Sequence, residues 1–82
     1  MYKTINELSA FVKQTIDSHW SLEISEEELI SIINSTFSDI HNRELAFRGT
    51  SFSPTFERKL GTERSLLLKS LLVNIDSNKY KF

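Results

Sequence analysis

The stretch Ser25-Glu26-Glu27-Glu28-Leu29 decides the fold, because it marks where a long helix must begin. Ser25 and Glu28 have the spacing of a capping box, in which each side chain accepts a hydrogen bond from the backbone of the other residue. Three carboxylates in the first turn also complement the helix dipole. Apolar residues then recur at three- and four-residue steps, which predicts an amphipathic helix: Leu29, Ile33, Phe37 and Ile40.

The end of this helix has two candidate positions. Asn42 is a residue type that can cap a helix C-terminus. The apolar pattern can also continue through Leu45 and Phe47 to Gly49, a good residue to follow a helix. The sequence leaves both positions open.

A second helix is predicted upstream. Thr4 and Glu7 again have capping-box spacing, so this helix begins at Thr4 and ends near Trp20. Its apolar face holds Ile5, Leu8, Phe11, Val12 and Ile16. The connection of residues 21–24 is short, which predicts that the two helices lie antiparallel.

Two further helices are predicted downstream of a loop at residues 49–54. Ser53-Pro54 opens a short helix that ends at Leu60, with proline at the first helical position. Thr62 is expected to cap a last helix over residues 63–74, which is apolar on most sides. The polar residues 76–82 are expected to fray, with a short strand over residues 79–82 as the alternative.

The prediction is therefore an all-α fold in one domain of 82 residues. It is a small helical bundle, built from an antiparallel helix hairpin, one short helix and one apolar C-terminal helix. The residues expected in its core are Leu8, Val12, Ile16, Leu29, Ile33, Phe37, Leu67 and Leu71.

The net charge of −1 hides an uneven distribution. Residues 1–42 hold two basic and seven acidic residues, whereas residues 43–82 hold eight basic and four acidic residues. Such a division is expected either to hold the halves together, within one fold or between subunits, or to attract a charged partner.

No catalytic, metal or cofactor site is predicted. The chain has no cysteine, and its two histidines, His19 and His41, are 22 residues apart. Ser38, Asp39 and His41 are neighbours in sequence, but a catalytic triad requires convergence in a pocket. With only two glycines there is no phosphate-binding glycine loop. We therefore expect no enzyme and no small-molecule substrate.

The segment 53–74 is the candidate for nucleic-acid binding. Two short helices joined through a glycine are similar to a helix-turn-helix motif, whose second helix enters the major groove. In that interpretation Arg64 reads a base edge and its basic neighbours contact phosphates. The candidate contact residues are Arg48, Arg58, Lys59, Arg64 and Lys69.

The aromatic residues support a different function class. An 82-residue chain has a small core, and its nine aromatic side chains exceed what that core is sure to hold. Exposed aromatics anchor protein interfaces. The candidate interaction residues are Trp20, Phe47, Phe52 and Phe56. The alternative is that all four belong to the core.

Location follows from what the sequence lacks. The opening residues have no apolar segment typical of a signal peptide, and no apolar run reaches the ~18–20 residues that span a bilayer. We therefore expect a cytoplasmic protein with no membrane partner.

The chain resembles a family of short uncharacterised proteins of low-GC Gram-positive bacteria and their phages. The resemblance rests on the opening residues 1–8, on Trp20 before the Ile24–Leu29 helix start, and on Leu60-Gly61 followed by Arg64. It implies a bacterial or prophage setting and no particular activity. We expect an accessory or regulatory module that acts by binding a protein or by self-association, with nucleic-acid binding as the alternative.

Overall fold

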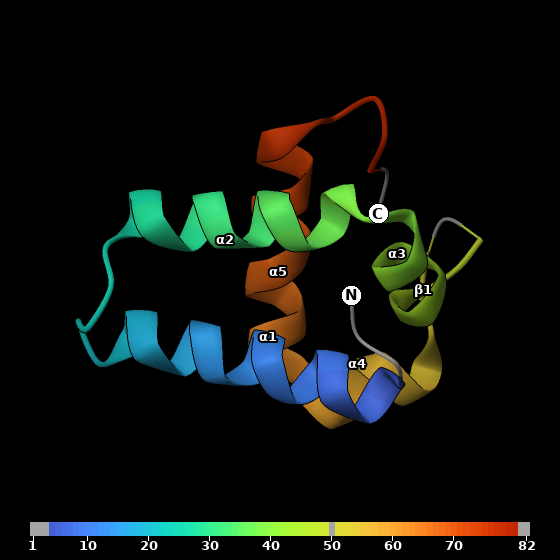
Figure 1. Cartoon of the computed structure of the whole chain (residues 1–82), viewed down its shortest axis with the longest axis horizontal. Coiled ribbons are helices and arrows are strands. Elements are labelled where there is room, and N and C mark those ends of the chain that lie inside the picture. The colour runs from blue at the N-terminus through green and yellow to red at the C-terminus, as the bar shows by residue number, and fades with distance from the viewer. Residues whose placement is uncertain (1–3, 50, 81–82) are drawn as a thin grey trace.

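The computed structural model describes residues 4–49 and 51–80. Figure 1 shows the helices and the small hairpin of this part of the chain. In chain order they are α1 (Ile5–Trp20), α2 (Glu26–Ser38), α3 (Ile40–Ala46), β1 (Phe47–Arg48), β2 (Ser51–Phe52), α4 (Pro54–Leu60) and α5 (Thr62–Ile75). The all-α prediction is confirmed, apart from the hairpin of two-residue strands.

Helices α1 and α2 begin where their capping residues predict. The Thr4 hydroxyl accepts a hydrogen bond from the Glu7 N–H at 3.2 Å. Ser25 and Glu28 form the complete capping box, with the Glu28 N–H 3.1 Å from the Ser25 hydroxyl oxygen. The two helices lie antiparallel, as the short connection predicts (Figure 1).

Helix α2 ends earlier than either predicted position. It stops at Ser38, and Asp39 begins α3 by accepting hydrogen bonds from the N–H groups of His41 (2.8 Å) and Asn42 (3.3 Å). Both predicted ends were wrong because the apolar pattern continues across this break while the backbone changes direction. Ile40, which was placed on the apolar face of α2, is 65% exposed as the first residue of α3.

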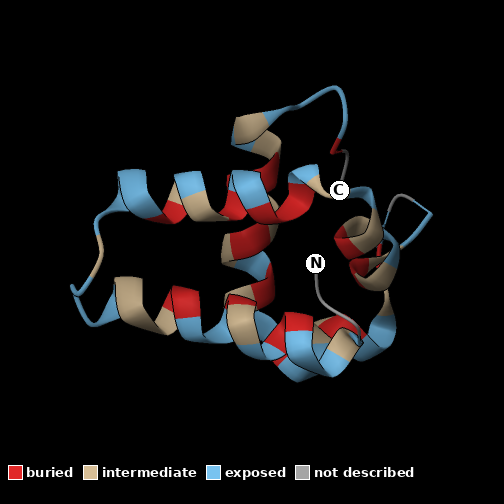
Figure 2. Cartoon of the chain, in the orientation of Figure 1, coloured by how far each residue is buried: buried red, intermediate tan, exposed pale blue. Residues whose placement is uncertain are grey.

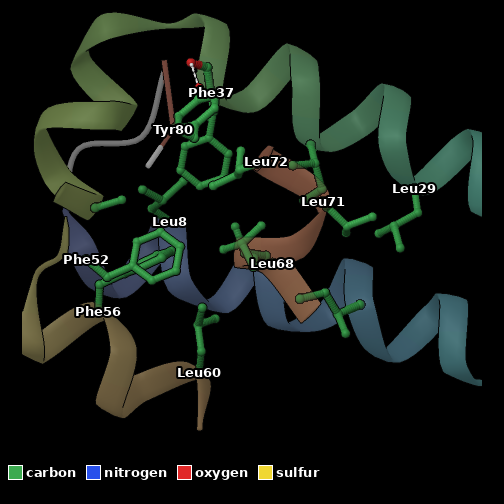
Figure 3. Close-up of a cluster of buried hydrophobic side chains, with 14 residues drawn as sticks. Leu8, Leu29, Phe37, Phe52, Phe56, Leu60, Leu68, Leu71, Leu72 and Tyr80 are labelled. Atoms are coloured by element: carbon green, nitrogen blue, oxygen red, sulfur yellow. Dashed lines mark hydrogen bonds between the residues drawn. The ribbon is translucent and has the colours of Figure 1, made fainter. Parts of the chain in front are cut away.

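The predicted loop at residues 49–54 begins inside a small hairpin. Phe47 pairs with Phe52 and Arg48 with Ser51 in an antiparallel register. Gly49 lies in the turn with a φ of +67°, a left-handed conformation that glycine adopts without steric cost. The pairing turns Phe52 inward, toward the start of α4 (Figure 3).

One residue, Gly61, joins α4 to α5. Its backbone has φ +89° and ψ 164°, a region that is essentially restricted to glycine. The predicted cap of α5 is displaced by one residue, because Gly61 occupies the capping position and Thr62 is already helical. Proline begins α4 as predicted, but the Ser53 side chain makes no capping hydrogen bond.

Helix α5 passes behind the α1–α2 hairpin and is buried along much of its length (Figure 2). Of the eight predicted core residues, only Leu67 is not buried, while Leu68 and Leu72 are fully buried. The prediction missed them because leucines surround this helix, so the pattern cannot identify its inward side. The buried apolar residues are Leu8, Val12, Ile16, Leu29, Ile33, Phe37, Ala46, Phe52, Phe56, Leu60, Leu68, Leu71, Leu72 and Tyr80.

The segment after α5, predicted to fray because it is polar, folds back onto the core as far as Tyr80. Asp76 accepts hydrogen bonds from the N–H groups of Asn78 (3.0 Å) and Lys79 (3.1 Å), which fixes a turn. Tyr80 then folds back, and its hydroxyl donates to the Phe37 carbonyl at 3.3 Å (Figure 3). A strand over residues 79–82 is not formed at Lys79, and residues 81–82 lie outside the described part.

Candidate functional site

The four aromatic residues predicted as contacts have different environments. Phe56 is fully buried and Phe52 is 3% exposed, and their rings are in edge contact with centroids 5.3 Å apart. Phe47 is half-buried and stacks on Tyr80. Trp20 is 46% exposed. The interface prediction was therefore wrong for Phe52 and Phe56, which are core residues, and Trp20 is the exposed member of the set.

Trp20 lies at the end of α1 in a small polar cluster. The Arg64 guanidinium lies 5.6 Å from the centre of the Trp20 ring, a cation–π distance. Its Nε and Nη2 atoms donate to the two oxygens of Asp17 at 2.8 and 3.1 Å, and Nη1 donates to the Leu60 carbonyl at 3.1 Å. Arg64 thus connects α1 to the α4–α5 joint and holds one side of the indole.

The connection after α1 places a leucine, Leu22, in the left-handed position that ends the helix. The Glu23 N–H donates to the Ser18 carbonyl (2.9 Å) and the Leu22 N–H to the His19 carbonyl (3.0 Å). This pair of bonds defines a Schellman motif, with Leu22 in the left-handed position that glycine usually occupies. Leu22 has a φ of +65°, and it is the one described non-glycine residue with positive φ.

Leu22 is also the most exposed large apolar residue in the described part of the chain, at 90%. It therefore gains nothing from burial while adopting a backbone conformation that costs an L-residue about 1–2 kcal/mol. Neither backbone preference nor core packing explains a leucine here. Strain of this kind, observed at an exposed position, is a reason to look for a binding role.

Exposed carboxylates follow Trp20 and Leu22 in the chain. All four glutamates of residues 23–28 are exposed: Glu23 is in the loop at the end of the α1–α2 hairpin, and Glu26, Glu27 and Glu28 form the first turn of α2 (Figures 1 and 2). Glu28 takes part in the capping box, and none of the four forms an ion pair within the described residues. We call this surface, Trp20, Leu22, Glu23, Glu26, Glu27 and Glu28, the hairpin tip.

Replacement of Leu22 by glycine should not destabilise the protein. Glycine removes the left-handed strain, and the gain is partly offset by the greater freedom of glycine in the unfolded chain. We expect the free energy of unfolding to rise by about 0.5–1 kcal/mol, measured by urea denaturation followed by circular dichroism. A loss of stability would show that the Leu22 side chain packs against the fold and would remove the reason for giving it a binding role.

The predicted nucleic-acid contacts do not form one basic surface. Arg64 is bound to Asp17, and the Lys69 ammonium lies 3.6 Å from a carboxylate oxygen of Glu57. Arg58 and Lys59 on α4 and Arg48 on β1 are exposed and form no ion pair with the described residues. Of these ion pairs, Arg64–Asp17 connects the acidic and basic halves of the chain.

The α4–α5 pair also differs from a helix-turn-helix motif. Its joint is the single residue Gly61, whereas that motif has a turn of three or four residues. The exposed residues of α5 include no lysine or arginine: they are Thr62, Glu63, Leu66, Ser70 and Asn74. A recognition helix would present basic or amide side chains on this face, so α5 lacks much of the chemistry that reads bases.

The described residues contain no group of three His, Cys, Asp or Glu side chains placed to hold a metal ion. The His19 ring nitrogen Nδ1 lies 3.3 Å from the Ile24 carbonyl oxygen, so this histidine in the last turn of α1 contacts the loop that leads to α2. Among the described helices, none combines the length and apolar character required to cross a bilayer.

Comparison with known proteins identifies a family for this chain, but it does not identify an activity. A family model named CLB_0814_fam, described as a conserved hypothetical protein, matches residues 1–73. This match confirms the resemblance to a family without an assigned function. No curated protein and no solved structure matches the chain significantly.

Proposed function

Because the chain belongs to the CLB_0814_fam family of conserved hypothetical proteins, whose description names no activity, we propose a function from its surface chemistry. The protein is a small accessory module that binds a partner protein through the hairpin tip. The proposal rests mainly on Leu22. Its side chain is exposed, and its backbone adopts a left-handed conformation in which glycine would be more stable.

The chemistry of the tip indicates what the partner segment contains. Trp20 and Leu22 offer apolar surface that gains free energy when water is removed from it. The four exposed glutamates of the hairpin tip favour lysine or arginine on the partner and disfavour acidic proteins. A segment with both features, such as a basic amphipathic helix, complements the tip.

Trp20 provides a direct measurement, because it is the single tryptophan of the chain. The probe is an amphipathic peptide of about 18 residues, five helical turns, made of leucine and lysine. We expect the peptide to shift the Trp20 emission to the blue, with saturation. Leu22→Gly should weaken this binding at least about tenfold, since burying a leucine contributes about 1.5–3 kcal/mol. Raising the salt concentration should also weaken peptide binding to the unmodified protein, because salt screens the attraction between the glutamates and the peptide lysines.

Two controls distinguish specific binding at the hairpin tip from non-specific hydrophobic or electrostatic binding. Ile40→Ser removes an exposed apolar side chain from α3, a helix at the other end of the molecule from the α1–α2 loop (Figure 1), and should leave the affinity unchanged. A peptide of leucine and glutamate should bind much more weakly than the basic one. The proposal would be contradicted if both peptides bound equally well, or if Leu22→Gly and Ile40→Ser lowered the affinity for the basic peptide by the same factor. A blue shift that grows with protein concentration alone and disappears in Leu22→Gly would instead assign the tip to a second copy.

Nucleic-acid binding has less support. Arg48, Arg58 and Lys59 are the candidate contacts without an ion pair among the described residues. Contacts from three cations predict a salt slope of at most about −3 for duplex DNA. Fluorescence anisotropy with mixed-sequence DNA and RNA measures that slope, and a steeper slope that Arg64→Ala reduces would favour nucleic acid over a protein partner.

A further inference from the structure

A pocket separate from the hairpin tip lies between α3, the β1–β2 hairpin and the segment after α5. It has a volume of about 200 Å³ and is lined by Arg43, Phe47, Gly49, Lys79 and Tyr80. This volume is below the roughly 300–1,000 Å³ of drug-sized ligand sites, so an occupant would be small. The hairpin tip belongs to the opposite end of the molecule (Figure 1).

Two cations gather around one tyrosine in this pocket. The Lys79 ammonium lies 5.7 Å from the centre of the Tyr80 ring. Arg43 lines the same pocket, and its charge lowers the pKa of the Tyr80 hydroxyl, which donates to the Phe37 carbonyl. Tyr80 is therefore fixed to the core on one side of the pocket, and both cations line the pocket with it.

No carboxylate of the described residues forms an ion pair with either cation. Asp76 is the acidic group with an electrostatic effect on Tyr80, and its Oδ1 accepts hydrogen bonds from the N–H groups of Asn78 and Lys79. Burial raises the pKa of the Tyr80 hydroxyl, and Arg43 partly opposes this shift. The tyrosine thus remains neutral at physiological pH and cannot serve as the counter-ion.

The wall of the pocket is aromatic. The Phe47 and Tyr80 rings stack with centroids 5.8 Å apart and an interplanar angle of 28°. Phe47 is half-buried and lines the pocket together with Tyr80. Gly49 also lines the pocket, and a methyl group added there would meet no atom within 4 Å apart from its chain neighbours.

We propose that this pocket binds a small organic anion with a flat apolar body, such as an aryl phosphate or an aromatic carboxylate. The anionic group lies between Arg43 and Lys79, where charge-assisted hydrogen bonds are strongest. The ring lies against Phe47. This function is independent of protein binding at the hairpin tip.

The test is a titration of the isotope-labelled protein by NMR with four probes: phenyl phosphate, benzoate, inorganic phosphate and benzyl alcohol. Phenyl phosphate and benzoate should shift the amide signals of Gly49 and Lys79 with saturation. Inorganic phosphate lacks the ring and benzyl alcohol lacks the charge, so each should bind at least about tenfold more weakly than phenyl phosphate.

Variants identify the residues responsible. Arg43→Gln and Lys79→Gln should each weaken phenyl phosphate binding about tenfold or more, whereas Lys59→Gln on α4 should change it less than twofold. Because Arg43 also contacts Tyr80, the exposed Lys79→Gln variant decides the result if Arg43→Gln does not fold. Absence of saturable shifts at Gly49 and Lys79 would overturn the proposal. An equal effect of Lys59→Gln and Lys79→Gln would also overturn it.

Discussion

Replacement of Phe56 by alanine should lower the free energy of unfolding by about 3–5 kcal/mol, the range for a fully buried phenylalanine. Phe56 has no exposed surface, and its ring makes edge contacts with Phe37 (6.4 Å) and Phe52 (5.3 Å). Its position on α4 places it among side chains from several helices (Figure 3). Truncation leaves a cavity that the surrounding helices cannot fill.

This loss is large for so small a protein. At roughly 0.05–0.15 kcal/mol per residue, a chain of 82 residues has a total stability of only about 4–12 kcal/mol. Urea denaturation followed by circular dichroism measures the change. Phe56→Leu should cost clearly less, because it retains most of the apolar volume. A loss below about 1 kcal/mol for Phe56→Ala would mean that Phe56 is exposed as an interface residue, as the sequence had suggested.

The second large effect is expected at Gly61. Its φ of +89° and ψ of 164° are accessible essentially to glycine alone, so Gly61→Ala should destabilise the protein by about 1–3 kcal/mol. The cost comes from the backbone, because the nearest atom to an added methyl group is an Arg64 nitrogen at an ordinary 3.8 Å. The same denaturation experiment measures it.

Gly49→Ala is the matched control for Gly61→Ala. Gly49 has a φ of +67° and no atom within 4 Å of an added methyl group. Its left-handed conformation is less restricted, so the expected cost is about 1 kcal/mol. If Gly61→Ala were neutral, the α4–α5 joint would have a different backbone from the one described here.

Local signals in the sequence were sufficient for the starts of α1 and α2. The Ser25–Glu28 capping box and the Thr4 cap act between residues three positions apart, so they can be read without knowledge of the rest of the chain. The break at Asp39 was missed because apolar residues continue on both sides of it. Asp39 itself is a good N-cap residue, and this signal was available in the sequence.

Other features depend on contacts between distant residues. Tyr80 is held by the Phe37 carbonyl, 43 positions away, so the polar composition around it gave no indication of burial. Arg64 was assigned to nucleic acid because its pairing with Asp17, 47 positions away, is not visible in the sequence. Composition alone also cannot separate core from interface aromatics, as Phe52 and Phe56 demonstrate.

Leu22 is the functional candidate that sequence analysis missed. The connection between the first two helices contains no glycine, so a residue of another type must adopt the left-handed conformation of a helix C-terminus. That absence was a usable signal. It indicated a strained position, although not which residue of the connection would occupy it.

The most direct test of binding at the hairpin tip is an amide chemical-shift map of the labelled protein with the leucine–lysine peptide. We expect the largest shifts at Trp20, Leu22 and residues 23–28, with smaller ones at Arg64, which contacts the Trp20 ring. Shifts concentrated instead on α3 and the β1–β2 hairpin, or spread evenly over the acidic residues of the chain, would contradict a binding site at the hairpin tip.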